Sequence, residues 1–228
     1  NDSLLHFVKP VFDRRVFLKT CTNGSSELMT NLSMSLVNAL YNLQLMKIAG
    51  ENGVAAYGAV MYVNFIFVAT FLGYAIGCAP VISYHYGAGN HAELKNLYKK
   101  SMSIILVWGV ILFGAAQLLA PVLSKIFVGY NTGLYAMTLH GFRVYAIAFL
   151  IIGINIFGSS FFTALNNGLI SAVISFLRTL VFQVIMVLTL PLWFGINGIW
   201  SAISIAEALT LIMTTTFFVR QKDKYHYL

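Results

Sequence analysis

The sequence predicts an all-α membrane protein, a polytopic bundle of six transmembrane helices. Of its 228 residues, 59% are hydrophobic and only 9% are charged, and the mean hydropathy is +0.80. These values lie far from the soluble average. Apolar runs of about twenty residues or more recur along the chain, the length that a helix needs to cross a hydrocarbon core about 30 Å thick. Strands of an outer-membrane barrel would instead alternate over segments of about ten residues.

The predicted elements follow one another with short connections. Residues 1–22 mix aromatic, aliphatic and basic side chains, which is typical of an amphipathic linker lying at a membrane surface. Residues 23–220 form the predicted bundle, and residues 221–228 are expected to form a cytoplasmic tail. At about 1.5 Å per residue, each apolar run can cross the bilayer as a helix. The six predicted spans are 25–47, 54–84, 98–120, 134–164, 168–192 and 197–219.

The charge distribution predicts the orientation of the chain. A formal charge of +7 could indicate nucleic-acid binding, but the cations lie just outside the apolar runs, so we expect no nucleic-acid partner. An even number of spans puts both ends on one side, whereas the opposite loops hold Lys47 and Lys125. The positive-inside rule therefore predicts that both termini are cytoplasmic. The cations on the terminal side are Lys9, Arg14, Arg15, Lys19, Lys95, Lys99, Lys100, Arg220, Lys222 and Lys224.

The sequence carries no recognisable enzyme motif. It has no Walker loop, nucleophile elbow, zinc-protease motif or dinucleotide fingerprint. Neither the number nor the spacing of Cys21 and Cys78 suggests a disulfide framework or a metal site. We expect a non-enzymatic protein with no metal and no cofactor.

Polar residues recur along one face of the first predicted span. Glu27, Asn31, Ser35, Asn38 and Asn42 are three or four positions apart, so all five project from the same side of a helix. Unsatisfied polar groups in hydrocarbon each cost on the order of kcal/mol, so this side cannot face lipid. It lines a water-filled cavity or, alternatively, forms hydrogen bonds with other helices.

The fourth span repeats this pattern more weakly. Tyr145, Asn155, Ser159 and Thr163 fall near one face among aliphatic residues. Tyr145 and Asn155 are therefore further candidates for lining a cavity. Packing between helices explains them equally well.

Two charged residues lie at matching depths in the last two spans. Arg178 is ten residues into the fifth span and Glu207 is twelve residues from the end of the sixth, so both lie near the midplane. A lone charge there costs about 2.5–3.5 kcal/mol, which favours an Arg178–Glu207 ion pair. The alternatives are separate solvation in a wet cavity, or an Arg178 side chain that extends to the interface.

Glu27 is the candidate for ion coupling. It has no evident cationic partner in its own span, and burial disfavours the charged form of a carboxylate. We therefore hypothesise that it binds and releases a proton during transport. The alternative is a structural carboxylate near the cytoplasmic interface.

Four segments, taken together and in order, resemble a known family. NGSSELMTNLSMSLVNALYN, GCAPVISYHYGAGN, INIFGSSFFTALNNG and LPLWFGINGIWSAISIAE look like the C-terminal lobe of the MATE family, the multidrug and toxic compound extrusion transporters, in its bacterial MepA-like branch. The resemblance covers nearly all of residues 20–219. It implies twelve helices in two six-helix lobes, with a central cavity between the lobes.

The resemblance also implies a function and a location. It implies a secondary active antiporter in the bacterial cytoplasmic membrane that exports cationic or amphipathic small molecules, driven by H⁺ or Na⁺ entry. The chain begins at Asn1, where the family's interlobe linker lies, so the expected partner is a missing N-terminal lobe. Rival interpretations are a lipid-linked precursor flippase of the same superfamily, with a more cationic cavity, and a non-transporting membrane scaffold.

Site residues follow from the same resemblance. The first span corresponds to the family's seventh helix, where several members carry a functional acid, and Glu27 falls there. Some members bind a cation through an aspartate on the tenth helix, but the nearest register here holds Ile152, which puts that kind of sodium site in doubt. Asn155 is the nearest polar residue, and we expect it to form hydrogen bonds in the cavity.

Overall fold

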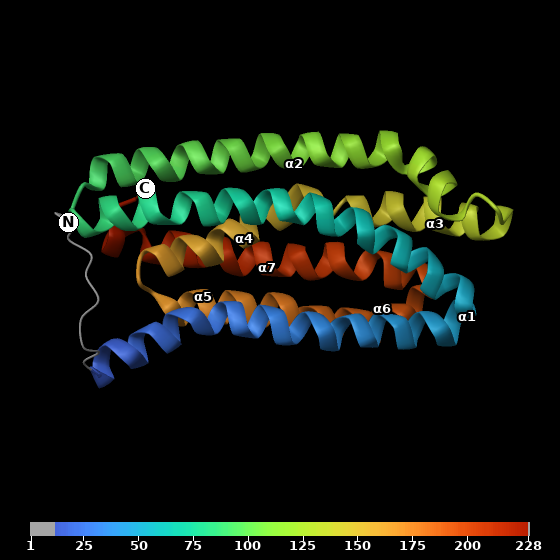
Figure 1. Cartoon of the computed structure of the whole chain (residues 1–228), viewed down its shortest axis with the longest axis horizontal. Helices are drawn as coiled ribbons and strands as arrows, with labels where there is room; N and C mark the ends of the chain where they lie inside the picture. Colours follow the sequence, from blue (N-terminus) through green and yellow to red (C-terminus); the bar gives the residue numbers. More distant parts are fainter. Residues whose placement is uncertain (1–11, 228) are drawn as a thin grey trace, which may run out of the picture.

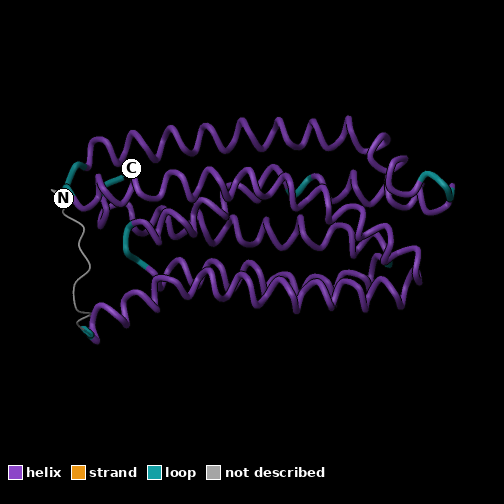
Figure 2. Tube along the Cα trace, viewed as in Figure 1, coloured by secondary structure: helices purple, strands orange, loops and turns teal. Residues whose placement is uncertain are grey.

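The computed structural model describes residues 12–227, and every regular element in that range is helical (Figures 1 and 2). Six side chains within the first helix are outside this description: those of Asn23, Ser25, Ser26, Glu27, Met29 and Thr30. The elements are α1 (Arg14–Gly87), α2 (His91–Val128), α3 (Thr132–Ala146), α4 (Phe149–Ala164), α5 (Gly168–Phe176), the π-helical turn η1 (Leu177–Phe182), α6 (Gln183–Phe194) and α7 (Ile196–Tyr225).

Helix α1 contains two crossings joined by a sharp break at Gly50. The backbone of Gly50 has φ 63° and ψ −154°, a conformation open essentially only to glycine. The chain reverses its direction here, as the blue and teal halves of α1 show in Figure 1. The apolar stretch Asn31–Gly87 alone has 57 residues, far more than one crossing needs. The first half of α1 (14–49) and the second half (51–87) are therefore separate spans.

The remaining spans match the predicted ones. By length and composition, four described helical stretches could cross a membrane, and the pair α3 and α4, bent by 48°, would make a fifth. Dividing α1 at Gly50 gives six. The six-helix prediction is confirmed at this level, with α5, η1 and α6 forming one continuous 27-residue stretch.

The helix ends differ from the predicted boundaries. Helix α1 begins at Arg14, inside the predicted linker 1–22, because the Asp13 carboxylate accepts hydrogen bonds from the backbone nitrogens of Arg15 (2.7 Å) and Val16 (3.3 Å). Residues 1–11 lie outside the described part. At the other end α7 continues to Tyr225, into the predicted tail. Hydropathy marks the lipid-crossing part of a helix, whereas capping groups mark its true end.

An aromatic cluster closes the end of the bundle where the C-terminus lies. The rings of Tyr98, Phe161, Phe218 and Tyr227 pack with centroids 5.0 to 6.2 Å apart. Tyr227 is fully buried, and its hydroxyl donates to the carbonyl oxygen of Phe218 over 2.9 Å. The end of the chain is therefore fixed to α2, α4 and α7.

Three buried contacts between helices depend on glycine. A Cβ atom on Gly141 would lie 2.5 Å from the Trp200 ring, one on Gly153 would lie 2.4 Å from Phe71, and one on Gly158 would lie 2.4 Å from the methyl group of Thr214. Small residues let helices approach closely within a membrane. Here they bring α3 and α4 against α7 and the second half of α1.

We expect Gly141→Ala to destabilise the bundle by about 1–3 kcal/mol, the usual cost of overpacking a well-filled core. Trp200 is only 1% exposed, so its ring cannot move aside into open space at the surface. Gly73→Ala is the matched control, because nothing lies within 4 Å of the position that a Cβ atom would take there. Loss of far-UV circular dichroism on heating in detergent measures the melting temperatures of both variants. Equal melting temperatures would contradict the packing described.

Candidate functional site

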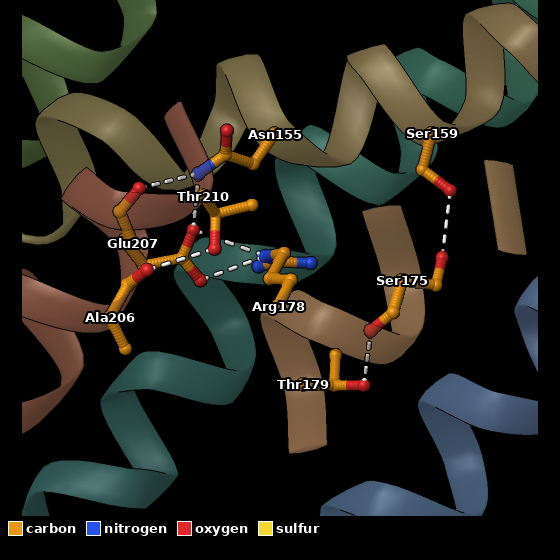
Figure 3. Close-up of polar contacts among 8 residues, drawn as sticks. All are labelled: Asn155, Ser159, Ser175, Arg178, Thr179, Ala206, Glu207 and Thr210. Atoms are coloured by element: carbon orange, nitrogen blue, oxygen red, sulfur yellow. Dashed lines mark hydrogen bonds and ion pairs between the residues drawn. The ribbon is translucent and has the colours of Figure 1, made fainter. Parts of the chain in front are cut away.

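An ion pair lies at the centre of the bundle. The Nε of Arg178 donates to both carboxylate oxygens of Glu207, over 2.8 Å to Oε1 and 3.1 Å to Oε2 (Figure 3). The Glu207 side chain is 1% exposed and that of Arg178 is 14% exposed. The two charges that the sequence places at matching depth are thus in direct contact. Arg178 forms the more accessible end of the pair.

Asn155 holds the carboxylate from the other side. Its Nδ2 donates to Glu207 Oε2 over 2.7 Å and to the Glu207 backbone oxygen over 2.9 Å (Figure 3). Asn155 is completely buried. A buried carboxylate requires both a counter-charge and hydrogen-bond donors, and Glu207 has both. The three residues connect α4, η1 and α7.

Arg178 belongs to the π-helical turn η1. Such turns carry an extra residue relative to an α-helix, and they occur frequently at functional sites. The turn connects α5 and α6 within one apolar stretch. It changes the angular position of the residues that follow, so the faces of α5 and α6 are not continuous.

A layer of hydroxyl groups continues from the ion pair between α4 and α5. Ser159 Oγ lies 2.9 Å from Ser171 Oγ and 2.8 Å from Ser175 Oγ. Thr163 Oγ1 lies 2.6 Å from Ser171 Oγ, and Thr179 Oγ1 donates to the Ser175 carbonyl oxygen over 2.6 Å. Figure 3 shows Ser159, Ser175 and Thr179 beside the ion pair. The layer lets two helices pack with their polar groups paired.

The polar stripe of the first span lies on the surface of this chain. The polar stripe consists of Asn31, Ser35, Asn38 and Asn42, all of which are exposed. At about 100° per residue, the stripe runs between a buried ridge and an exposed apolar face. The buried ridge consists of Ser33, Val37, Tyr41 and Leu45, and the apolar face includes Leu32, Leu36 and Leu43.

The stripe is linked to the second half of α1. The Tyr57 hydroxyl donates to Asn38 Oδ1 over 3.0 Å, and the Tyr57 ring stacks on Tyr41 with centroids 5.0 Å apart. Asn42 donates to the backbone oxygen of Asn38 in its own helix, over 3.0 Å. The amide groups of the stripe are therefore not enclosed by neighbouring helices of this chain.

The ion pair and the polar stripe lie at the same depth. Lys19 and Thr22 border one pocket with Gly168, so α1 and α5 start side by side, and both run away from that end (Figure 1). Arg178 follows Gly168 by ten residues, as Leu32 follows Thr22. Equal rise per residue therefore places Arg178 near the level of Leu32, at the Asn31 end of the stripe.

The other predicted cavity residues lie inside the bundle. Asn155 is fully buried against Glu207, and Tyr145 is 6% exposed with its ring 6.1 Å from that of Phe149. Both differ from the cavity-lining position expected, because each finds its partner within the lobe. The side chain of Glu27 lies outside the described part of the structure. Among the described residues, no three His, Cys, Asp or Glu side chains are grouped as metal ligands.

Sequence reasoning missed Ser171, Ser175 and Tyr57. The serines and Thr179 recur every four residues, so the same helical spacing that identified the stripe could have identified the hydroxyl layer. Nothing in the sequence indicated that Tyr57 would contact the stripe, because a lone tyrosine near a span end usually lies at the interface.

Comparisons with known proteins agree on one fold. A family model described as MatE matches residues 28–189. A MATE structure in the bent conformation superposes with a TM-score of 0.89, at 20% identity, over 99% of this chain and 50% of that one. An outward-facing multidrug resistance MATE family transporter of the MOP superfamily gives 0.85, at 20% identity, over 95% and 48%.

A further solved structure belongs to a MOP superfamily transporter from Pyrococcus furiosus. It gives a TM-score of 0.86 at 20% identity, over 95% of this chain and 49% of that one. This chain thus spans about half the length of the solved structures it matches. The search of curated proteins gave no match.

We expect Asn155→Ala to lower the stability of the bundle by about 1–3 kcal/mol, because a buried carboxylate loses a donor. Asn42→Ala is the matched control: its side chain is exposed and bonds its own helix, so its effect should stay within about 0.5 kcal/mol. Thermal unfolding in detergent measures both. An Asn155→Ala loss no larger than that of Asn42→Ala would show that Asn155 does not support the ion pair.

Proposed function

The chain belongs to the MatE family, and on that premise we propose that it forms the C-terminal lobe of a secondary active transporter that exports cationic or amphipathic compounds. The observation that carries the proposal is the exposed polar stripe of α1 at membrane depth. Export would proceed by alternating access between this lobe and an N-terminal one, with entry of H⁺ or Na⁺ as the driving force.

The stripe supports a water-filled cavity between two lobes. Three amides and a hydroxyl in one row cannot face acyl chains without losing hydrogen bonds worth on the order of kcal/mol each. The adjacent Leu32, Leu36 and Leu43 suit lipid, so one helix presents an apolar side to the bilayer and a polar side to the cavity. This arrangement is expected of a helix at the edge between two lobes.

The charges near the cavity support cationic or amphipathic compounds. The one cation that the sequence places at the midplane, Arg178, is paired with Glu207. A flippase for lipid-linked precursors, which carry phosphate, would favour an excess of positive charge here. A scaffold protein would have the stripe covered by its own helices, but Asn31, Ser35, Asn38 and Asn42 are exposed.

The remaining assignments complete the proposal. The protein is a multi-pass membrane protein, and we place it in the bacterial cytoplasmic membrane with both described ends on the cytoplasmic side. Glu27 remains the first candidate for ion coupling, since it continues the row of the stripe by one helical turn.

Cysteine labelling tests the cavity. In a background with Cys21 and Cys78 replaced by serine, we expect Asn38→Cys and Asn42→Cys to react with a membrane-impermeant maleimide in the full-length protein. Leu36→Cys and Leu43→Cys are matched controls, because both leucines are exposed in this chain but lie on the apolar face (52% and 59%). We expect these to react slowly, since lipid excludes the reagent. Equal labelling of both faces would contradict the cavity.

Transport by the full-length protein tests the mechanism. We expect a fluorescent cationic dye to move across proteoliposome membranes when a proton or sodium gradient is imposed, with each gradient applied separately. Liposomes without protein and liposomes without a gradient are the controls. Dye movement that depends on neither gradient would rule out antiport.

A further inference from the structure

The terminal nitrogens of Arg178 are available at the midplane. The ion pair uses only Nε, and no hydrogen bond of Nη1 or Nη2 is found among the described residues. The Arg178 side chain is 14% exposed, whereas Glu207 is enclosed. Figure 3 shows the Arg178 guanidinium beside the Glu207 carboxylate. A positive charge that Glu207 no longer balances would therefore lie at the depth of the Asn31 end of the stripe.

Asn155 can serve Glu207 in either protonation state. Its Nδ2 now donates to the carboxylate, and its buried Oδ1 has no partner among the described residues. An amide offers two donors at one end and an acceptor at the other, so a half-turn about its last bond presents the oxygen to the Glu207 carboxyl group and gives up the Nδ2 bond to the Glu207 backbone oxygen. That oxygen could accept the hydrogen of a protonated Glu207. A lysine or arginine at position 155 could not do so.

Few titratable groups face Glu207 from the helices around α7. Tyr145 on α3 and Tyr41 on α1 lie within electrostatic range of it, and Arg178 approaches from η1. Helices α4, α5 and α6 carry no titratable side chain. The Tyr57 hydroxyl, which bonds Asn38, connects Tyr41 with the stripe.

Other ionisable groups on these helices lie far from Glu207. On α3, His140 bonds Asn197, which precedes Glu207 by ten residues or about 15 Å along α7. Arg220, the nearest charge after Glu207 on α7 itself, is about 20 Å along the helix. Glu27 is outside the described side chains. Arg178 is therefore the only described side chain of opposite charge in contact with Glu207.

We propose that Glu207 is a proton-carrying residue of this transporter and that Arg178 is its internal counter-cation, which makes proton binding and binding of a cationic compound mutually exclusive. The inference rests on the proposed function and goes beyond it. The carboxylate takes up one proton and becomes a neutral acid, while Arg178 keeps its own proton. The charge of the pair changes from zero to +1, and loss of the same proton restores the neutral pair.

The charge change has a direct effect on a cationic compound in the cavity. The unbalanced guanidinium lies at the depth of the stripe, so it repels a cationic compound that is bound there. At an effective dielectric constant of about 20, one unit charge about 10 Å away weakens binding by about tenfold. Proton entry on one side would thus release the compound, and deprotonation on the other would allow the next to bind.

Binding of a cationic dye to the full-length protein in nanodiscs tests the inference. Wild type should bind the dye more weakly at acidic pH than at alkaline pH. Glu207→Gln should bind weakly at both, about tenfold below alkaline wild type. Arg178→Gln/Glu207→Gln removes both charges and should regain most of the affinity without pH dependence. His140→Gln is the control, which keeps the wild-type pH dependence.

The double variant still tests the inference if Glu207→Gln misfolds, because the double variant leaves no unpaired charge in the core. If its dye binding keeps the wild-type pH dependence, or stays as weak as that of Glu207→Gln, the inference is wrong. A purely structural role would alter the melting temperature of these variants but not the pH dependence of dye binding.

Proteoliposomes separate this inference from the proposed function. Proton-driven dye movement should be present in wild type and His140→Gln and absent in both Glu207 variants. Dye movement in wild type driven by sodium but not by protons would overturn the proton assignment and leave antiport standing. If neither gradient moves the dye through wild type, the proposed function itself fails.

Discussion

The ion pair between Arg178 and Glu207 is the constraint on which the interior of this lobe depends. Either charge alone would be costly at the midplane, and removing one partner of a buried pair costs more than the pair itself contributes. The pair therefore fixes the relative depth of α7 and the fifth span. Asn155 adds α4 to the same contact. Three spans are held in register by one carboxylate.

The polar groups of the lobe form two systems, one in its interior and one on its surface. Inside, the Glu207 carboxylate accepts from Arg178 and Asn155, and the hydroxyl groups of the layer pair with one another, as a low-dielectric interior favours. On the surface, the stripe of α1 leaves its amides exposed. Tyr41 and Tyr57 lie between the two systems, with Tyr57 bonded to the stripe and Tyr41 near Glu207. Two side chains thus connect the interior charge with the exposed stripe.

Much of this arrangement is readable from the sequence, because lipid imposes simple rules. Hydropathy located all six spans, and equal depth paired Arg178 with Glu207. The partner of Asn155 was not predictable, since the rotation of α4 depends on packing of the whole bundle. The π turn η1 has no sequence signature, and the start of α1 at Arg14 depends on a local cap at Asp13, to which hydropathy is insensitive.

Because residue 155 is an amide, the proposed uptake of one proton by Glu207 would change the net charge of the group from zero to positive. An acid in this position would give the group two negative charges against one arginine, so one proton would change its net charge from −1 to zero and never make it positive. The amide leaves Glu207 and Arg178 in balance, so the net charge is zero with the proton absent and positive with it present. With no acid in the fourth span, this part of the lobe is suited to repel a cation on protonation rather than to hold one permanently.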